Sequence, residues 1–124
     1  MNIRTLTAKD RIIAVIDSDS PVLTDVQSGL DLIATLWHEV DGVNAIILPK
    51  AAIDEAFFEL RTGIAGGILQ KLINYRTKMA IVGDFSGYTS KALADFIREC
   101  NRGHDFFFVS TEEEAVSMLS AARG

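Results

Sequence analysis

A polar run from Gly83 to Lys91 carries the densest set of groups that could bind a ligand. Its charged and hydroxyl side chains belong to Asp84, Ser86, Thr89, Ser90 and Lys91. The run follows an apolar segment and precedes a helical pattern, and α/β proteins bind ligands where a strand gives way to a helix. Lys91 and the backbone N–H groups after Thr89 could therefore hold an anion or the phosphate of a nucleotide. The Gly-x-x-x-x-Gly-Lys-Ser/Thr spacing of a P-loop is absent, so an ordinary turn followed by a helix cap is the alternative.

Other catalytic or metal-binding arrangements find little support in the residue types. Asp17 and Asp19 could hold Mg²⁺ together with Asp84, but we favour a turn stabilised by Asp and Ser hydrogen bonds. His38 and His104 have no Cys or carboxylate partner at metal-ligand spacing. The chain has no Gly-x-Ser-x-Gly segment and no histidine near a candidate nucleophile. We therefore expect neither a metal nor another cofactor, and we favour a protein without enzymatic activity.

The candidate binding residues would be positioned by strands and helices, because apolar runs alternate along the chain with segments of helical periodicity. Four runs that are apolar almost throughout are typical of strands buried on both faces: residues 12–16, 43–48, 79–83 and 106–109. A weaker, alternating strand at 3–7 fits an exposed edge. Apolar residues recur at helical spacing in 26–40, 64–73, 92–100 and 115–119. The sequence therefore predicts a single α/β domain, residues 1–124, with a mostly parallel sheet of four or five strands and about four helices in the order ββαβαβαβα.

Length, charge and cysteine content narrow the class of protein. The chain has 124 residues, enough for one domain with a buried core. Its formal net charge of −5, with basic residues scattered singly, argues against nucleic acid as a partner. No apolar run approaches the roughly 20 residues that span a bilayer, and the first residues lack the apolar core of a signal peptide. We therefore expect no membrane contact and a cytoplasmic location. Cys100, the single cysteine, excludes an intramolecular disulfide and predicts a reduced thiol that packs against neighbouring residues from its helix.

The longest irregular segment, Pro49 to Gly63, is a second candidate for a functional surface, because long loops in compact domains are often functional. It contains Phe57 and Phe58, which could form a short helical turn; we expect at least one of them to be buried. Gly63, Gly66 and Gly67 indicate a close approach of the backbone, for which we expect the sheet rather than a ligand as the neighbour.

The order of elements resembles that of the STAS domain, named for sulphate transporters and anti-sigma-factor antagonists. In that family an Asp-Ser-Ser/Thr-Gly segment at the start of the second helix carries a hydroxyl that a partner kinase phosphorylates. Arg61-Thr62-Gly63-Ile64-Ala65-Gly66 looks like this motif, although Leu60 and Arg61 depart from it. The resemblance implies that Thr62 is a phosphoacceptor, since a phosphate at a helix N-terminus is stabilised by free N–H groups. A simple helix cap is the alternative role for Thr62.

The chain after about Val43 is similar to a bacterial family catalogued as domain of unknown function 4180. The segments that carry this similarity are 57–66, 81–86, 89–91, 95–97, 99–103 and 107–109. This family carries no known activity, but the STAS resemblance implies a regulatory or protein-interaction module, whose partner is another protein or a second copy in a homodimer. Its partner-facing residues are expected to be Phe57, Phe58, Arg61, Gly63 and Tyr88. The alternative is a small anion- or nucleotide-binding protein, or a minor enzyme, that uses the Gly83–Lys91 run.

Overall fold

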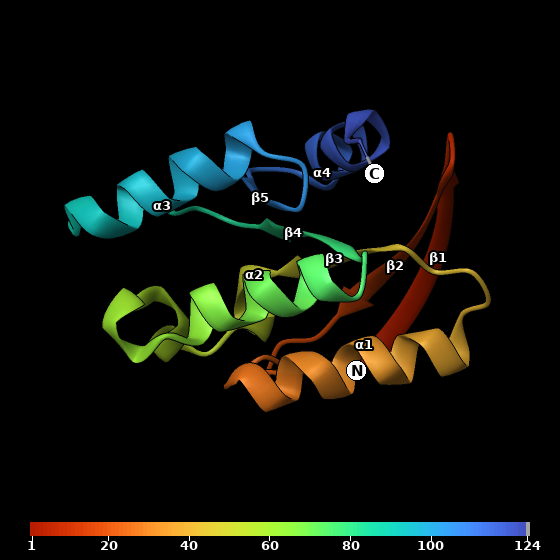
Figure 1. Cartoon of the computed structure of the whole chain (residues 1–124), viewed down its shortest axis with the longest axis horizontal. Helices are drawn as coiled ribbons and strands as arrows, with labels where there is room; N and C mark the ends of the chain where they lie inside the picture. Colours follow the sequence, from red (N-terminus) through yellow and green to blue (C-terminus); the bar gives the residue numbers. More distant parts are fainter. Residues whose placement is uncertain (124) are drawn as a thin grey trace.

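The computed structural model describes residues 1–123 and contains five strands, four helices and three short 3₁₀ turns (Figure 1). The strands are β1 (Asn2–Ala8), β2 (Arg11–Asp17), β3 (Ala45–Pro49), β4 (Lys78–Val82) and β5 (Phe106–Val109). The helices are α1 (Val26–Glu39), α2 (Ile64–Asn74), α3 (Lys91–Arg102) and α4 (Glu112–Ala121). The 3₁₀ turns η1 (Lys50–Ala52), η2 (Glu55–Phe58) and η3 (Leu60–Thr62) connect β3 to α2.

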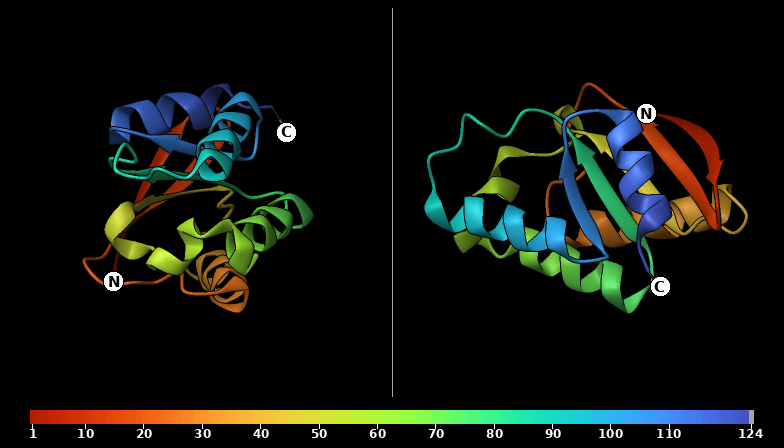
Figure 2. Two further views of the ribbon diagram at one scale, coloured as in Figure 1. Left: turned by 90° about the vertical axis from the view of Figure 1, so that its left-hand side faces the viewer. Right: turned by 90° about the horizontal axis from the view of Figure 1, so that it is seen from above.

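The five strands form one sheet in the order β1-β2-β3-β4-β5. β1 pairs with β2 in antiparallel fashion, whereas the other three pairs are parallel. The sheet is therefore mixed rather than wholly parallel. Each parallel crossover leads to the next strand in the same direction, and right-handed crossovers then place their helices on one face. Accordingly α1, α2 and α3 pack on one face, and α4 packs on the other (Figures 1 and 2).

Both faces of the parallel strands are buried. Ile46 and Leu48 of β3 point to the face that α1–α3 cover, whereas Ile47 points to the face that α4 covers with Ala115 and Leu119. Because neither face meets water, these strands contain no alternating polar residues. The edge strand β1, by contrast, contains only exposed and half-buried residues.

The predicted α/β class is confirmed, with five strands and four helices that overlap the predicted segments. The helix starts are set by polar caps: Asp25, Ser90 and Thr111 each accept a hydrogen bond from a backbone N–H of the first turn of α1, α3 and α4 respectively. No helix within residues 1–123 is long and apolar enough to cross a membrane.

Two glycines determine how closely α1 and α2 pack against each other. A Cβ at Gly67 of α2 would lie 2.5 Å from Cγ2 of Val26, and one at Gly29 of α1 would lie 3.2 Å from Ile68. These glycines therefore let α2 pack closely along α1. The expectation that Gly67 packs on the sheet is wrong, because its close neighbour is a helix; Gly66 has open space beside it. On its other side, the backbone of α2 lies farther from that of α3.

Candidate functional site

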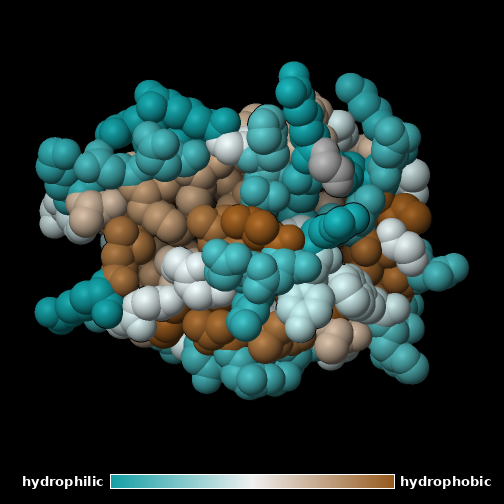
Figure 3. All heavy atoms as spheres, in the orientation of Figure 1, coloured by the Kyte–Doolittle hydropathy of each residue, from teal (hydrophilic) through white to brown (hydrophobic). Residues whose placement is uncertain are grey.

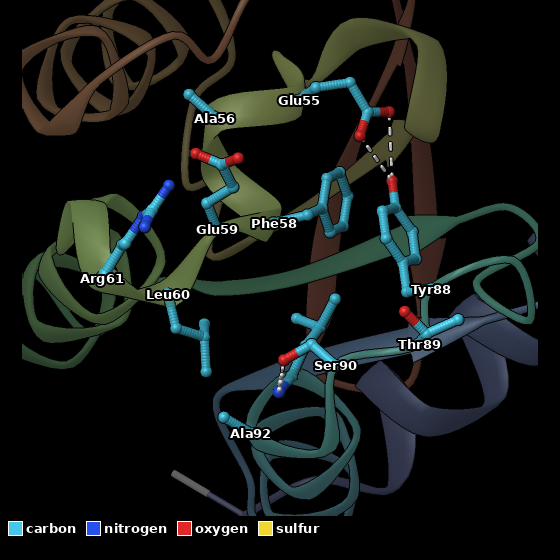
Figure 4. Close-up of a pocket in the computed structure, with 11 residues that line it drawn as sticks. Glu55, Ala56, Phe58, Glu59, Leu60, Arg61, Tyr88, Thr89, Ser90 and Ala92 are labelled. Atoms are coloured by element: carbon cyan, nitrogen blue, oxygen red, sulfur yellow. Dashed lines mark hydrogen bonds between the residues drawn. The ribbon is translucent and has the colours of Figure 1, made fainter.

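A groove of about 650 Å³ opens at the carboxyl end of β3 and β4, where open α/β sheets bind ligands. We call it the interloop groove (Figure 4). One wall comes from the segment between β3 and α2, with Glu55, Ala56, Phe58, Glu59, Leu60 and Arg61. The other wall comes from the segment between β4 and α3 and the first turn of α3, with Tyr88, Thr89, Ser90, Ala92 and Leu93. The groove thus joins the two segments that the sequence marks separately as candidate surfaces.

The first wall is held by local hydrogen bonds and by a buried ring. Asp54 caps η2 by accepting from the N–H of Ala56 at 2.9 Å. Phe57 is completely buried, with its ring centroid 5.9 Å from that of Phe106. The hydroxyl of Thr62 lies 2.8 Å from the carbonyl oxygen of Glu59 and 3.0 Å from that of Ala56, and it donates to these carbonyls. These contacts fix the 3₁₀ turns against the core, so the wall is ordered rather than an open loop.

The second wall begins with a turn that uses its own polar groups. Asp84 accepts from the N–H of Ser86 at 2.9 Å and from its hydroxyl at 2.6 Å. These hydrogen bonds hold the pKa of the Asp84 carboxyl below its usual value. Ser90 caps α3 by accepting from the N–H of Leu93 at 3.2 Å. The turn therefore leads directly into α3, whose first turn belongs to this wall.

Aromatic and charged side chains connect the two walls at one end of the groove. The rings of Phe58 and Tyr88 are stacked, with centroids 4.9 Å apart. The Tyr88 hydroxyl donates to the Glu55 carboxylate, at 3.0 and 3.1 Å from its two oxygens. Nζ of Lys50 lies 5.0 Å from the Tyr88 ring centroid and 3.7 Å from Glu55. A Cβ at Gly83 would lie 2.6 Å from Cβ of Lys50, so this glycine makes room for the lysine stem.

At this end of the groove, neither Lys50 nor Tyr88 has a pKa low enough to act as a base or nucleophile at neutral pH. Interaction with the Tyr88 hydroxyl, followed by the nearby Glu55 and Asp84 charges, raises the pKa of Lys50. Burial raises the pKa of Tyr88. Lys50 is therefore a cation and Tyr88 a neutral phenol under ordinary conditions. Lys50 and Glu55 are site residues that the sequence did not predict, since neither belongs to a motif.

The predicted partner-facing residues divide between groove and core. Phe58, Arg61 and Tyr88 line the interloop groove. Phe57 has no exposed surface, because it fills the space beneath η2, and it is not available to a partner. Gly63 lies outside the lining and adopts φ +77, the left-handed conformation that lets η3 turn into α2.

The predicted anion-binding residues do not converge. Thr89 and Ser90 line the interloop groove, whereas Asp84, Ser86 and Lys91 do not. Nζ of Lys91 lies 2.9 Å from Asp95 on the exposed side of α3, and the Ser86 hydroxyl is bound to Asp84. The groups that could hold an anion therefore point in different directions.

The remaining candidates do not line the groove themselves. The Thr62 hydroxyl accepts from the Ile64 N–H at 3.3 Å, but the N-cap residue of α2 is Gly63. Asp17 is paired with Arg4 at 3.1 Å and lies at a separate surface depression with Asp19. Within residues 1–123, no three His, Cys, Asp or Glu side chains are grouped so that they could hold a metal.

Comparison with known families covers both walls of the groove. A family model described as "Domain of unknown function (DUF4180)" matches residues 8–119. The chain belongs to the DUF4180 family. No curated protein and no solved structure matches it significantly. The DUF4180 match confirms the resemblance inferred from the segments after Val43. The matched region contains every residue that lines the groove.

Proposed function

We propose that this DUF4180 chain is a cytoplasmic, non-enzymatic interaction module that binds a segment of another protein in the interloop groove. The observation that carries the proposal is the character of the groove. The apolar side chains of its walls, Phe58, Leu60 and Leu93, are buried or half-buried and form its floor, whereas Glu59 and Arg61 are exposed at its rim. Neither of these two charged side chains has a hydrogen-bond or ion-pair partner among residues 1–123. An apolar floor with unpaired charges at the rim suits recognition of a protein segment.

The state of the polar groups supports binding over catalysis. The hydroxyls of Ser90 and Thr62 are each engaged with the backbone, and the Tyr88 hydroxyl is bound to Glu55. A nucleophile needs an adjacent base that can take its proton. Neither histidine lines the groove, so the imidazole that most often serves as this base does not face a hydroxyl there.

A STAS-like regulatory role would give Thr62 a defined part. Its hydroxyl donates to carbonyls of η2 and to that of Glu59, on the wall of the groove. A phosphate ester cannot donate these hydrogen bonds, and its charge would repel Glu59. Phosphorylation would therefore loosen the wall and weaken partner binding. Mass spectrometry of the protein from its own host tests this role. Absence of phosphate on Thr62 under every growth condition, with an inert Thr62→Ala variant, would exclude the switch.

The interaction itself is tested with a photo-crosslinking amino acid at position 61, introduced into the chain in its own host. Ala92 lines the groove, so Ala92→Trp fills it, whereas Ala94 is exposed on the same helix outside the lining. We expect a discrete protein adduct that Ala92→Trp abolishes and Ala94→Trp leaves intact. An adduct of twice the chain's mass would identify a second copy as the partner. No adduct, or equal loss in both variants, would refute a protein partner at this groove.

A thermal-shift screen with phosphate, nucleotides and Mg²⁺ distinguishes anion or nucleotide binding from the proposed protein interaction. Because Lys91 is paired with Asp95 away from the groove, we expect shifts below about 1 °C, unchanged by Lys91→Ala. A shift of several degrees that Lys91→Ala abolishes would favour the small-molecule function instead.

A further inference from the structure

The two edges of the sheet differ in how their backbone groups are satisfied. At the β5 edge, the Asn101 side chain of α3 bonds to the strand. Its Oδ1 accepts from the N–H of Phe108 at 2.8 Å, and its Nδ2 donates to the carbonyl of Phe108 at 3.2 Å. β5 is also short, with four residues. Short edge strands and side chains that occupy the edge hinder pairing with other chains, so the β5 edge is protected.

The β1 edge has none of these protections in the part of the chain that the structure describes. β1 has seven residues, contains no proline and pairs with β2 residue for residue from Asn2 to Ala8, without a bulge. Its one charged side chain, Arg4, turns back to Asp17 of β2 and Glu112 of α4. Figure 2 (right) shows β1 as the outermost strand of the sheet. A long, regular edge strand of this kind is a template for a further strand.

The hydrogen-bond pattern identifies which residues of β1 face the open edge. Ile12 of β2 donates to Oδ1 of Asn44 and accepts from the Asn44 N–H, so its backbone groups point toward β3. Thr7 lies opposite Ile12 and therefore belongs to a pair that exchanges no hydrogen bonds. Because the direction of the backbone groups alternates along a strand, Thr7, Thr5 and Ile3 all face away from β2. Their N–H and C=O groups have no backbone partner within residues 1–123.

A second copy of β1 satisfies all of these groups in one register. In an antiparallel pair, residues that face outward must lie opposite residues that also face outward. With a two-fold axis at Thr5, each Thr5 lies opposite its counterpart, and each Ile3 lies opposite Thr7 of the other copy. Each of these pairs exchanges two hydrogen bonds, so no outward group of either strand remains unpaired.

The neighbouring registers are less favourable. A two-fold axis at Arg4 would place the two Arg4 side chains directly opposite each other, and like charges in this position are destabilising. An axis at Leu6 would place Ile3 opposite Lys9, which lies in the hairpin turn with φ +54 and does not continue the strand. The axis at Thr5 instead places the stem of Arg4 beside half-buried Leu6 of the other copy. β1 is therefore complementary to itself in one antiparallel register.

The side chains near this edge suit a contact made through the backbone. Figure 3, in the orientation of Figure 1, shows hydrophilic side chains over the outer end of the β1–β2 hairpin at the upper right. Thr5 and Thr7 are exposed on one face of β1, and threonine pairs across neighbouring strands stabilise sheets. Backbone hydrogen bonds, rather than an apolar patch, therefore provide the specificity of this edge.

We infer that β1 pairs with β1 of a second copy of this chain, antiparallel about a two-fold axis at Thr5, so that the two five-stranded sheets form one continuous sheet. The inference goes beyond the interaction proposed at the interloop groove and does not depend on it. β1 contributes no residue to the lining of that groove, so each copy in the dimer keeps its own groove.

Cysteine crosslinking of the full chain tests the register. In a Thr5→Cys dimer the two new thiols lie opposite each other, with Cα atoms about 5.5 Å apart, a distance that a disulfide spans. Thr7→Cys is the matched control on the same edge and face, because its two thiols would lie four residues apart, at least about 13 Å. The native Cys100 is buried and is common to both variants. Under mild oxidation we expect Thr5→Cys to form a covalent dimer and Thr7→Cys to remain a single chain. Crosslinking of neither variant, or of both equally, would overturn the inference.

Sedimentation velocity of the purified chain tests the association itself. We expect the mass to rise from one chain to two with increasing concentration. Thr5→Pro should weaken the dimer about tenfold or more, because it removes an N–H that faces outward. That N–H makes no bond to β2, so the variant should keep its fold, which circular dichroism verifies.

Thr5→Ser is the control, because it keeps the backbone N–H and should change the affinity less than about threefold. A chain that stays monomeric up to about 1 mM, or a dimer that Thr5→Pro leaves equally stable, would overturn the inference. If Thr5→Pro does not fold, the two cysteine variants decide.

Discussion

Replacing Gly67 with alanine should destabilise the fold, although alanine is the better helix former. The added Cβ would lie 2.5 Å from Cγ2 of Val26, about 1 Å inside ordinary van der Waals contact. Val26 is β-branched and begins α1, so its side chain has one strongly preferred rotamer and cannot easily turn away. The helices must then separate, and overpacking of this kind typically costs about 1–3 kcal/mol.

The neighbouring glycine provides the control. Nothing lies within 4 Å of a Cβ at Gly66, so Gly66→Ala should gain up to about 1 kcal/mol from helix propensity alone. Gly67→Ala receives the same gain but also bears the clash. We therefore expect its free energy of unfolding to be about 1–3 kcal/mol lower than that of Gly66→Ala. Urea denaturation followed by circular dichroism measures both values.

A double-mutant cycle assigns the cost to one contact. In Val26→Ala the two methyl groups nearest to position 67 are gone, and the next neighbour lies 3.6 Å away. Gly67→Ala should therefore be tolerated in that background, with a coupling energy of at least about 0.5 kcal/mol. If Gly67→Ala stabilises the wild-type chain as much as Gly66→Ala does, the close packing of α1 and α2 is refuted.

Three further substitutions test other parts of the fold. Arg11→Met should lower the free energy of unfolding by about 1–3 kcal/mol in urea titrations, because buried Arg11 donates to the carbonyls of Leu119 and Ala122 at the end of α4; an unchanged midpoint would contradict this. Thr62→Val should cost about 0.5–1.5 kcal/mol by the same assay, since it removes the donor to the first wall of the groove, and Thr62→Ser should restore most of it. Burial raises the pKa of the Cys100 thiol from 9.0 to about 11, so the unfolded chain loses this proton at lower pH than the folded one. The contribution of Cys100 to stability is therefore complete below pH 9 and falls by up to about 2–3 kcal/mol as the pH rises to 11. Cys100→Ala should remove that part of the alkaline loss of stability; an identical pH profile in the variant would contradict the assignment.

The elements of this fold could be predicted where one local signal dominates. The strands 12–16 and 106–109 are uninterrupted apolar runs, and Asp25 and Thr111 are capping residues at the start of regular apolar periods. These signals need no knowledge of the rest of the chain. Strand register and the neighbours of each helix depend on the whole chain. The residue closest to Gly67, for example, belongs to α1, and no pattern within α2 indicates this.

The candidate site could be predicted only as two unrelated segments. Phe58 and Tyr88 are thirty positions apart, and their stacking follows from the pairing of β3 with β4. Lys50 is recognised only once Gly83 is known to lie against its stem. Tertiary packing also decides that Phe57 is buried while Phe58 lines the groove. The sequence does not show which of two adjacent phenylalanines in a 3₁₀ turn will face the core.

The sequential strand order has a consequence for how the chain is made. As the protein emerges during synthesis, each parallel strand can pair at once with the strand made just before it, so most sheet contacts form between recently made segments. The face that carries Val15, Ile47 and Phe107 is different, because α4 is made after all five strands and covers it only then. A nascent chain stalled before α4 would therefore present a broad apolar sheet to the cell, and this is the stage at which chaperones should recognise it.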